Sequence, residues 1–256
     1  MSTYVVSDIH GQFKAFLRGL DVIEFNDNDS LYVIGDAIDR GSDGIPLLEY
    51  IRNHPNTDLL IGNHEFMMLN SVDPDGEKSC PGKDASLWLL YNSGHTTIEQ
   101  YLNLSQGERI ALLQWLRERC VIKTLVVGER KFCLTHSYYY PECENIPYYK
   151  LDYEDVWHLT WDSIFRDDKD THAENIYKNY DCTFITGHVP AQVVRYERSK
   201  DHNYGELRSL RDGNLIDIDG YCALGYHRLI PSGLIFLRLD DLTEFAIPLI
   251  EGEISE

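Results

Sequence analysis

The amino-acid sequence predicts a mixed α/β fold, and two patterns support this class. The first third of the 256-residue chain alternates short apolar runs, typical of strands, with runs that have the spacing of amphipathic helices. From residue 182 onward the pattern is mostly that of strands. Because alternating strands and helices favour a parallel sheet with right-handed crossovers, we expect the amino-terminal part to form such a sheet.

The expected elements follow one another closely in the first third of the chain. Three apolar runs have the length of strands, namely residues 4–7, 31–34 and 58–61. Helical runs separate and follow them, at residues 12–25, at residues 45–52 and from residue 65 onward. In the first of these helices, Phe13, Phe16 and Leu20 recur at the spacing that places them on one face. This order predicts the β-α-β-α-β-α arrangement.

The rest of the chain adds longer helices and further strands. Two helical stretches are expected at residues 85–102 and 106–119. Strand runs then follow at residues 122–127, 131–135, 184–186, 215–218, 234–239 and 244–250. The polar turns 128–130 and 240–242 divide the first two and the last two of these runs, so each pair is expected to form a hairpin.

The charge of the chain excludes several classes of function. Lys and Arg number 23 against 42 Asp and Glu, which gives a net charge of −19. Binding to nucleic acid or to an anionic membrane depends on clustered basic residues, so neither partner is expected. The six cysteines are spread out and never reach CxxC spacing, which disfavours a zinc ribbon or a disulfide framework. With no apolar run of roughly 18 residues and no leader pattern, a cytoplasmic location is expected.

A single domain over residues 1–256 is expected, with a tyrosine-rich acidic insertion or lid at about 138–181. That segment holds 8 of the 17 tyrosines, and 11 acidic residues against 4 Lys or Arg. The favoured interpretation is that its rings pack over the sheet with their hydroxyls in water. The alternative is an acidic aromatic rim that selects a basic or peptide substrate. A later basic stretch alternates with acidic residues and is expected to be a solvated loop; it contains Arg195, Arg198, Lys200, Arg208 and Arg211.

Polar clusters recur where the predicted strands end. The three early clusters are Asp8-Ile9-His10-Gly11, Gly35-Asp36-Ala37-Ile38-Asp39-Arg40-Gly41 and Gly62-Asn63-His64-Glu65. His136 and His188 follow two later strands. In open α/β sheets ligands bind outside the carboxyl ends of strands, so these clusters are expected to converge on one crevice.

Two Asp, one Asn and three His form a ligand set suited to metal ions. Mixed carboxylate and imidazole ligands favour Mn, Fe or Zn over Ca or Mg. Six ligands are too many for one catalytic ion that keeps open positions, but they suit two. Two ions roughly 3.5–4 Å apart can activate a bridging water and hold both oxygens of an in-line phosphoryl displacement.

The three early motifs, in this order and spacing, resemble the signature of the calcineurin-like metallophosphoesterases. The sequence Asp39-Arg40-Gly41 resembles the phosphoprotein phosphatase family of Ser/Thr phosphatases, in particular its short bacterial and phage members. The resemblance implies a four-layer αββα sandwich with two mixed sheets. Ser7 departs from the pattern, because the family usually has Gly before the first Asp.

The resemblance also implies a role for each site residue. Asp8 and His10 would bind the first metal, Asp36 would bridge, and Asn63, His136 and His188 would bind the second. His64 would be the general acid, oriented by Asp39. The substrate phosphate would be bound by Arg40, Asn63 and Arg166, the last lying near Trp161 in a region that does not align cleanly.

The implied activity is that of a phosphomonoester hydrolase of the Ser/Thr protein phosphatase type. A hydroxide bridging two divalent ions would attack the phosphorus directly, without a phosphoenzyme intermediate. The expected ions are Mn²⁺, with Fe or Zn as alternatives. The substrate would be a phosphorylated protein or peptide or a small phosphoester, since an acidic lid would repel free polyanions. Hydrolysis of a dinucleoside polyphosphate is the alternative within the same chemistry. A non-catalytic binding module is disfavoured because the ligand set and the acid–arginine pair are present. The sequence carries no signal for an oligomeric state.

Overall fold

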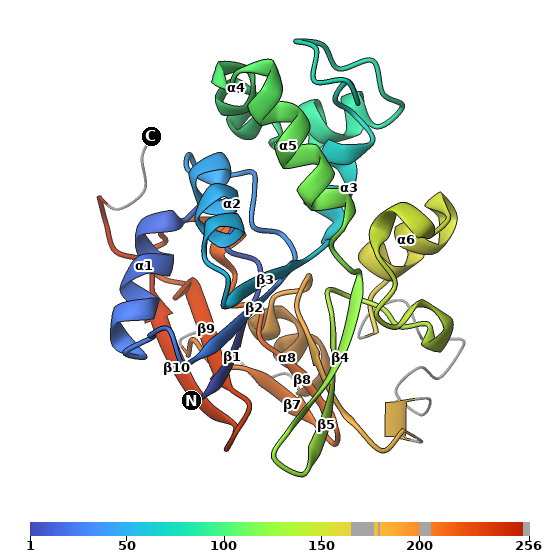
Figure 1. The fold of residues 1–256 in the computed structure, drawn as a ribbon. Helices are drawn as coiled ribbons and strands as arrows, with labels where there is room; N and C mark the ends of the chain where they lie inside the picture. The colour runs from blue at the N-terminus through green and yellow to red at the C-terminus, as the bar shows by residue number, and fades with distance from the viewer. Residues whose placement is uncertain (165–176, 179, 200–205, 253–256) are drawn as a thin grey trace.

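The computed structural model contains two five-stranded β-sheets among the residues that it describes, which are 1–164, 177–178, 180–199 and 206–252 (Figure 1). The sheets lie against each other, and helices lie outside them. The strand order is β10-β9-β1-β2-β3 in the first sheet and β4-β5-β6-β8-β7 in the second. Both sheets mix parallel and antiparallel neighbours, so the predicted architecture of two mixed sheets is confirmed.

The first sheet is built mainly from the amino-terminal third of the chain. Its strands are β1 (Thr3–Val6), β2 (Ser30–Ile34), β3 (Thr57–Leu60), β9 (Gly233–Arg238) and β10 (Thr243–Pro248). The first three are parallel, as predicted, with Tyr4 opposite Leu31 and Val33 opposite Leu59. The carboxy-terminal hairpin joins the sheet through β9, which is antiparallel to β1. All five strands lie within about two residues of the predicted ranges.

The second sheet comes from the middle of the chain. Its strands are β4 (Ile122–Val127), β5 (Arg130–Thr135), β6 (Thr183–Thr186), β7 (Leu210–Asp212) and β8 (Leu215–Asp217). The predicted hairpin of β4 and β5 is confirmed, and β5, β6 and β8 are parallel. Strand β7 was not predicted, because its three residues are too few to show an alternation of apolar and polar side chains. It pairs with β8 at the edge of the sheet.

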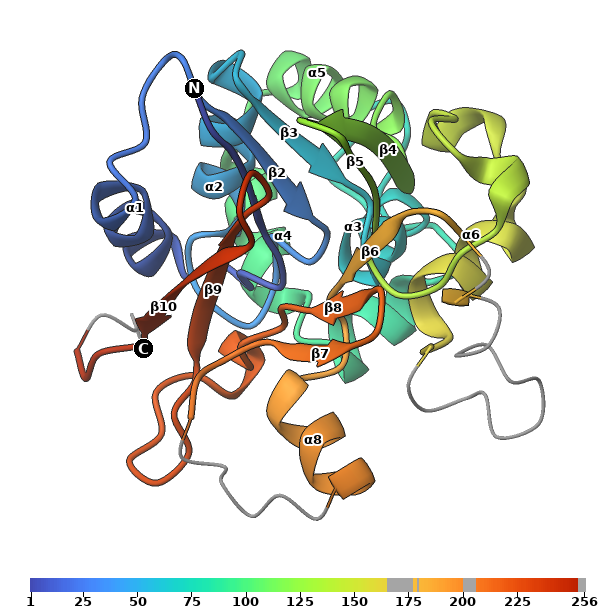
Figure 2. The ribbon, with the colours of Figure 1, turned by 90° about the horizontal axis from the view of Figure 1, so that it is seen from below.

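A core of aliphatic and aromatic side chains fills the space between the sheets. Successive strand residues point to opposite faces, so Ile185 of β6 faces this inner core while Phe184 packs in the outer one. Helices α1 (Phe13–Val22) and α2 (Gly44–Asn53) pack on the outer face of the first sheet, and α8 (Ala191–Ser199) packs on β7 of the second (Figure 2). The layers are therefore α, β, β and α, as the resemblance implied.

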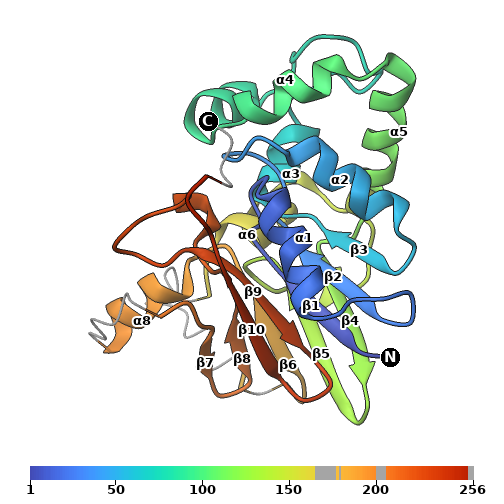
Figure 3. The same ribbon diagram turned by 90° about the vertical axis from the view of Figure 1, so that its left-hand side faces the viewer.

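Three further helices gather beyond the carboxyl end of β3. They are α3 (Asn63–Leu69), α4 (His95–Asn103) and α5 (Gln106–Arg117), and Figure 3 shows α4 and α5 at one end of the molecule. The single helix predicted over 85–102 is wrong, because a five-residue π-helix (Leu87–Tyr91) precedes a break. Ser93 adopts a positive φ of 60° at this break, which no helix accommodates. None of the helices in the described residues is long and apolar enough to cross a membrane.

The basic stretch differs in part from its prediction as a solvated loop. Arg208 and Arg211 are exposed as expected, and Lys200 lies outside the described residues. Residues 191–199 form α8, and Arg195 on it is only 5% exposed. Its guanidinium donates to the backbone carbonyls of Arg208 and Glu206, 2.6 and 2.8 Å away. Alternating charges in the sequence therefore concealed a buried arginine that ties α8 to the chain before β7.

The tyrosine-rich segment contributes α6 (Tyr153–Trp161) and two rings of the outer core. Tyr139 and Tyr177 are buried and pack edge-on against Phe184, with ring centroids 5.0 and 4.4 Å apart. The favoured interpretation of rings packing over the sheet holds for these two. The hydroxyl of Tyr139 is not left in water, because it donates to Glu144 at 2.5 Å. Arg166, the predicted second phosphate-binding arginine, lies outside the described residues.

Candidate metal centre

The predicted ligands converge at the carboxyl ends of parallel strands from both sheets. They follow β1, β2, β3, β5 and β6, and are Asp8, His10, Asp36, Asn63, His136 and His188. All are buried except His188, which is half-buried. Two groups of side chains could each hold an ion, because their ligand atoms all lie within 4.8 Å of one another. One group contains His10, Asp36 and His64, and the other contains Asp36, His136 and His188.

The second group has the spacing of a coordination sphere. The Asn63 amide oxygen lies 3.0 Å from His136 Nε2 and 3.2 Å from His188 Nδ1. His136 Nε2 is also 3.4 Å from Asp36 Oδ1. Metal–ligand bonds of about 2.1 Å at right angles place neighbouring ligand atoms about 3.0 Å apart. The Asn63 oxygen faces acceptor atoms only, an arrangement that a cation among them satisfies.

The first group is arranged more loosely around the other oxygen of Asp36. His10 Nε2 lies 3.7 Å and His64 Nε2 3.8 Å from Asp36 Oδ2. Asp8, predicted to share a metal with His10, does not fall within this group. Its carboxylate instead accepts the backbone N–H of His188, at 3.0 and 3.2 Å. Asp36 is therefore the residue shared by both groups, which is the position of a bridging ligand.

Hydrogen bonds on the far side of two rings fix which nitrogen faces the site. His136 Nδ1 lies 2.9 Å from the Ile34 carbonyl, and His10 Nδ1 lies 3.2 Å from the Ile38 carbonyl. A carbonyl only accepts, so each Nδ1 carries the proton and each Nε2 presents a lone pair to the site. Burial lowers the pKa of both histidines well below the ordinary value, which keeps the rings neutral. Neutral imidazoles with outward-facing backbone partners are the form that binds metal.

The carboxylates respond to the same burial in the opposite sense. Burial is the largest cause that raises the pKa of Asp8 and of Asp36 well above the usual value, and neighbouring acids raise it further. Two cations beside these carboxylates would offset both the cost of burying their charge and the repulsion from neighbouring acids. The donor set thus fits a pair of divalent ions: Asp36 between them, Asn63, His136 and His188 on one side, and His10 on the other.

The backbone of the site is strained at most of the predicted residues. Positive φ angles between 49° and 72° occur at Asp8, His10, Asp36, Asp39, Arg40 and His188. Non-glycine residues seldom adopt this region, and each instance costs on the order of 1–3 kcal/mol. Such strain persists where the surrounding structure holds it, and here it falls in the loops that follow β1, β2 and β6.

The predicted acid pair is formed by a short hydrogen bond. His64 Nδ1 lies 2.6 Å from Asp39 Oδ2, and both side chains are buried. The opposite ring nitrogen, Nε2, faces the metal groups. Arg40 follows Asp39 in the same loop, and its side chain is exposed.

Two acidic residues at the site had no role in the sequence analysis. Glu65 accepts four backbone N–H groups, from Asp36, Ala37, Ile38 and Gly62, at 2.8–3.3 Å. Its position three residues after Gly62, at the start of a helix, was a signal for such a role. The carboxyl of Asp219 follows β8, and burial raises its pKa to about 7. No motif in the early chain pointed to it.

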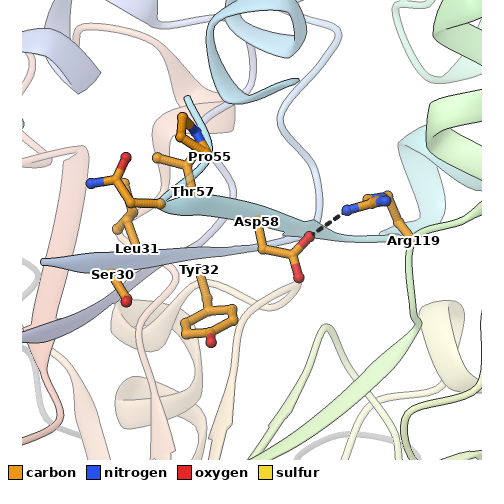
Figure 4. A pocket seen from close by; sticks show the side chains of 8 residues that line it. Ser30, Leu31, Tyr32, Pro55, Thr57, Asp58 and Arg119 are labelled. Carbon is orange, nitrogen blue, oxygen red and sulfur yellow. Dashed lines mark hydrogen bonds and ion pairs between the residues drawn. The ribbon is translucent and has the colours of Figure 1, made fainter. Parts of the chain in front are cut away.

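A separate hollow lies at the opposite ends of β2 and β3 (Figure 4). This cavity of about 280 Å³ is lined by the first residues of both strands and by Arg119. Arg119 is already paired with Asp58 at 2.9 Å. Among the described residues, no predicted site residue lines this cavity, so it is separate from the candidate metal centre.

Comparison with curated proteins finds symmetrical bis(5'-nucleosyl)-tetraphosphatases from several bacteria. A symmetrical bis(5'-nucleosyl)-tetraphosphatase of Nitrosomonas europaea is 26% identical over 281 aligned residues, covering 98% of this chain and 99% of that protein. A protein of the same name from Buchnera aphidicola is 28% identical over 139 residues, 54% of this chain and 44% of its own length. This chain therefore spans less than half of the first curated relatives it matches.

Solved structures and a family model extend the comparison. The cold-active protein-tyrosine phosphatase of a Shewanella species has a TM-score of 0.58 at 17% identity, covering 96% of this chain and 80% of that one. A metallophosphoesterase from Sphaerobacter thermophilus has a TM-score of 0.53 at 15% identity, with 98% and 88% covered. At these identities the two structures show the fold alone. The model for calcineurin-like phosphoesterases matches residues 1–218, and the chain therefore belongs to the calcineurin-like phosphoesterase family.

Proposed function

We propose that this protein hydrolyses the phosphoanhydride chain of a dinucleoside polyphosphate with the help of two divalent cations. The observation that carries the proposal is the match to the Nitrosomonas tetraphosphatase over nearly the whole of both chains. It favours the alternative that the sequence analysis kept open over the protein phosphatase activity. Both curated relatives described above carry the name of a tetraphosphatase.

Members of this family use a dinuclear divalent metal centre, and the candidate ligands described above are of the kind that could hold one. When bound, two such ions supply a nucleophilic water near neutral pH and neutralise charge on the phosphoryl group. Mn²⁺ is the first ion to test, because carboxylate, amide and imidazole ligands suit it.

The side chains around the site would orient the substrate and move one proton. Arg40 presents a guanidinium, whose paired N–H groups match two phosphate oxygens. His64 holds its Nδ1 proton against Asp39, so its Nε2 is the nitrogen that can donate to the leaving oxygen. The exposed position of Arg40 allows it to meet a chain of phosphates that extends out of the crevice.

The net charge of −19 is compatible with such a substrate only through the metal centre. Two divalent ions and Arg40 bring five positive charges to a pocket that holds several carboxyl groups, among them Asp8, Asp36 and Glu65. Bound metal therefore offsets the negative charge of the pocket, although the chain as a whole is acidic. We expect affinity for a polyphosphate to depend steeply on metal loading for this reason.

The decisive experiment compares substrates on the purified, Mn²⁺-loaded protein. Diadenosine tetraphosphate, a phosphopeptide and a nitrophenyl phosphate are assayed side by side, and the products are separated by chromatography. We expect kcat/KM for the tetraphosphate to exceed the others by about 100-fold or more, with ADP as the product of symmetrical cleavage. His136→Ala, which removes a ligand, serves as the inactive control. A higher kcat/KM on the phosphopeptide would contradict the proposal and restore the protein phosphatase hypothesis.

A further inference from the structure

The carboxylate that orients His64 is held by two residues beyond the early motifs. The indole Nε1 of Trp88 donates to Asp39 Oδ2 at 2.7 Å, beside the 2.6 Å contact to His64. The hydroxyl of Thr97 donates to Asp39 Oδ1 at 2.5 Å. The same hydroxyl oxygen accepts the backbone N–H of Asp39 at 3.0 Å. Each oxygen of the carboxylate thus has a donor other than His64.

Both donors are buried in positions that leave them little freedom. Trp88 and Thr97 have exposed fractions of 0%. Trp88 lies in the five-residue π-helix, a wider turn that is rare and is common at functional sites. A Cβ atom built on Gly94 would lie 2.6 Å from three atoms of the indole, and one built on Gly44 would lie 3.1 Å from the Thr97 hydroxyl. Two glycines therefore allow the ring and the hydroxyl to reach the carboxylate.

A buried carboxylate with a single partner could rotate about its side-chain torsions and turn the imidazole with it. Charge-assisted hydrogen bonds are directional, and three of them to one carboxylate define its plane. A misplacement of about 1 Å in a catalytic group can cost about 100-fold in rate. The orientation of His64 Nε2 toward the crevice consequently depends on the donors that hold Asp39.

We propose that Trp88 and Thr97 are positioning residues, which hold Asp39 so that His64 can protonate the leaving group. This inference deepens the proposed function, because it rests on His64 being the general acid of that site. In the step concerned, the oxygen of water forms the new bond to phosphorus, and the water passes one of its protons to the solvent. The leaving oxygen keeps the electron pair of the broken P–O bond and takes the proton from His64 Nε2. The Nδ1 proton stays on the ring, bonded to Asp39.

A series of aryl phosphates separates positioning of the acid from a general structural effect. Dinitrophenolate is a stable anion that departs without a proton, whereas phenolate needs one. Loss of acid catalysis therefore slows phenyl phosphate and spares dinitrophenyl phosphate, while a damaged fold or a lost metal slows both. The assay uses the metal-loaded protein, and metal content is measured for each variant.

Three variants carry the test, each with a matched control. Thr97→Val removes the hydroxyl and keeps the shape, and Thr97→Ser restores the hydroxyl. Trp88→Phe removes the indole N–H and is matched by Trp115→Phe, a half-buried tryptophan that packs on Arg119. Gly94→Ala presses on the indole at a helical φ of −62°, and is matched by Gly107→Ala, where a Cβ meets nothing within 4 Å.

For Thr97→Val we expect kcat on phenyl phosphate to fall by about 10- to 100-fold with KM unchanged. On dinitrophenyl phosphate kcat should stay within about twofold, and Thr97→Ser should recover most of the loss. His64→Asn is run beside it as the reference for a missing acid. An equal loss on both substrates in Thr97→Val and Trp88→Phe, at full metal content, overturns the positioning role.

The outcome also distinguishes this proposal from the proposed function. Absence of tetraphosphate hydrolysis, with aryl phosphates still cleaved, refutes the substrate and leaves the positioning role standing on its own series. If His64→Asn slows phenyl phosphate and dinitrophenyl phosphate equally, the acid assignment and the positioning role are both overturned. If His64→Asn slows phenyl phosphate selectively but Thr97→Val slows both substrates equally, the positioning role alone is overturned.

Discussion

Replacing Glu65 by Gln tests how the two early metal-binding loops are joined. The carboxylate of Glu65 is fully buried and accepts N–H groups from two loops, those that follow β2 and β3. Oε1 accepts from Ala37 and Ile38, and Oε2 accepts from Asp36 and Gly62. Gln has the same shape, but one oxygen becomes an NH₂ group that cannot accept.

The magnitude follows from the number of donors left without a partner. In whichever orientation the amide settles, two buried N–H groups face a donor. Each buried, unsatisfied group costs about 1–3 kcal/mol, so Glu65→Gln should lower the free energy of unfolding by about 2–6 kcal/mol. This is a large part of the 5–15 kcal/mol that is usual for a domain. Burial also raises the pKa of Glu65, but the N–H groups of Asp36, Gly62 and Ala37 oppose that shift and favour the charged carboxylate.

Urea unfolding of the metal-free protein measures this effect without any contribution from bound ions. Glu108→Gln is the matched control, because Glu108 also accepts the N–H of the residue before its helix, Ser105, but is exposed. The control should unfold close to wild type. If Glu65→Gln unfolds at the same urea concentration as Glu108→Gln, Glu65 does not join the loops in the way the hydrogen bonds indicate.

Three further predictions follow from the same site. A Cβ at Gly187 would lie 2.1 Å from Asp8 Oδ2, so Gly187→Ala should displace Asp8 and reduce kcat/KM by about 100-fold, while Gly107→Ala should not. The folded-state pKa of Asp219 is raised to about 7, so its proton stabilises the metal-free fold at low pH and this stability is lost as pH rises through about 7. The urea concentration at the unfolding midpoint should therefore decrease from about pH 5 to about pH 8 in wild type, and decrease less in Asp219→Asn. An equal decrease in both proteins would refute this. His136→Ala should reduce bound metal from about two ions per chain to about one by elemental analysis, and unchanged stoichiometry would remove His136 from the ligand set.

The strands and the early site residues could be predicted because their signals are local. Asp8, Asp36 and Asn63 each follow an apolar run within a few residues, and parallel strands bring their carboxyl ends together. Pairing of β1, β2 and β3 in chain order then places the clusters side by side. The same rule extends to His136 and His188, which follow strands of the second sheet.

The missed residues depend on contacts between distant parts of the chain. Trp88 and Thr97 reach Asp39 across 49 and 58 residues, and no spacing in the sequence reports that approach. Apolar residues recur at helical spacing throughout 85–102, both in the π-helix and in α4. The sequence pattern therefore gives no sign of the break at Ser93. Arg195 was missed for a related reason, since its partners are backbone carbonyls that the sequence does not display.

The buried groups of the site explain why metal and fold should be coupled in this protein. Burial raises the pKa of Asp8, Asp36 and Asp219 and lowers that of His10 and His136, so both kinds of side chain are pushed toward their neutral forms. For a histidine the neutral form binds metal, but for a carboxylate it does not. A bound cation therefore stabilises the ionised carboxylates and leaves the histidines as they are. Metal binding therefore releases protons from whichever of these acids are protonated in the metal-free protein, and the affinity should weaken as the pH falls. An affinity independent of pH would mean that the acids are already ionised in the metal-free protein, and that burial costs them less than the structure indicates.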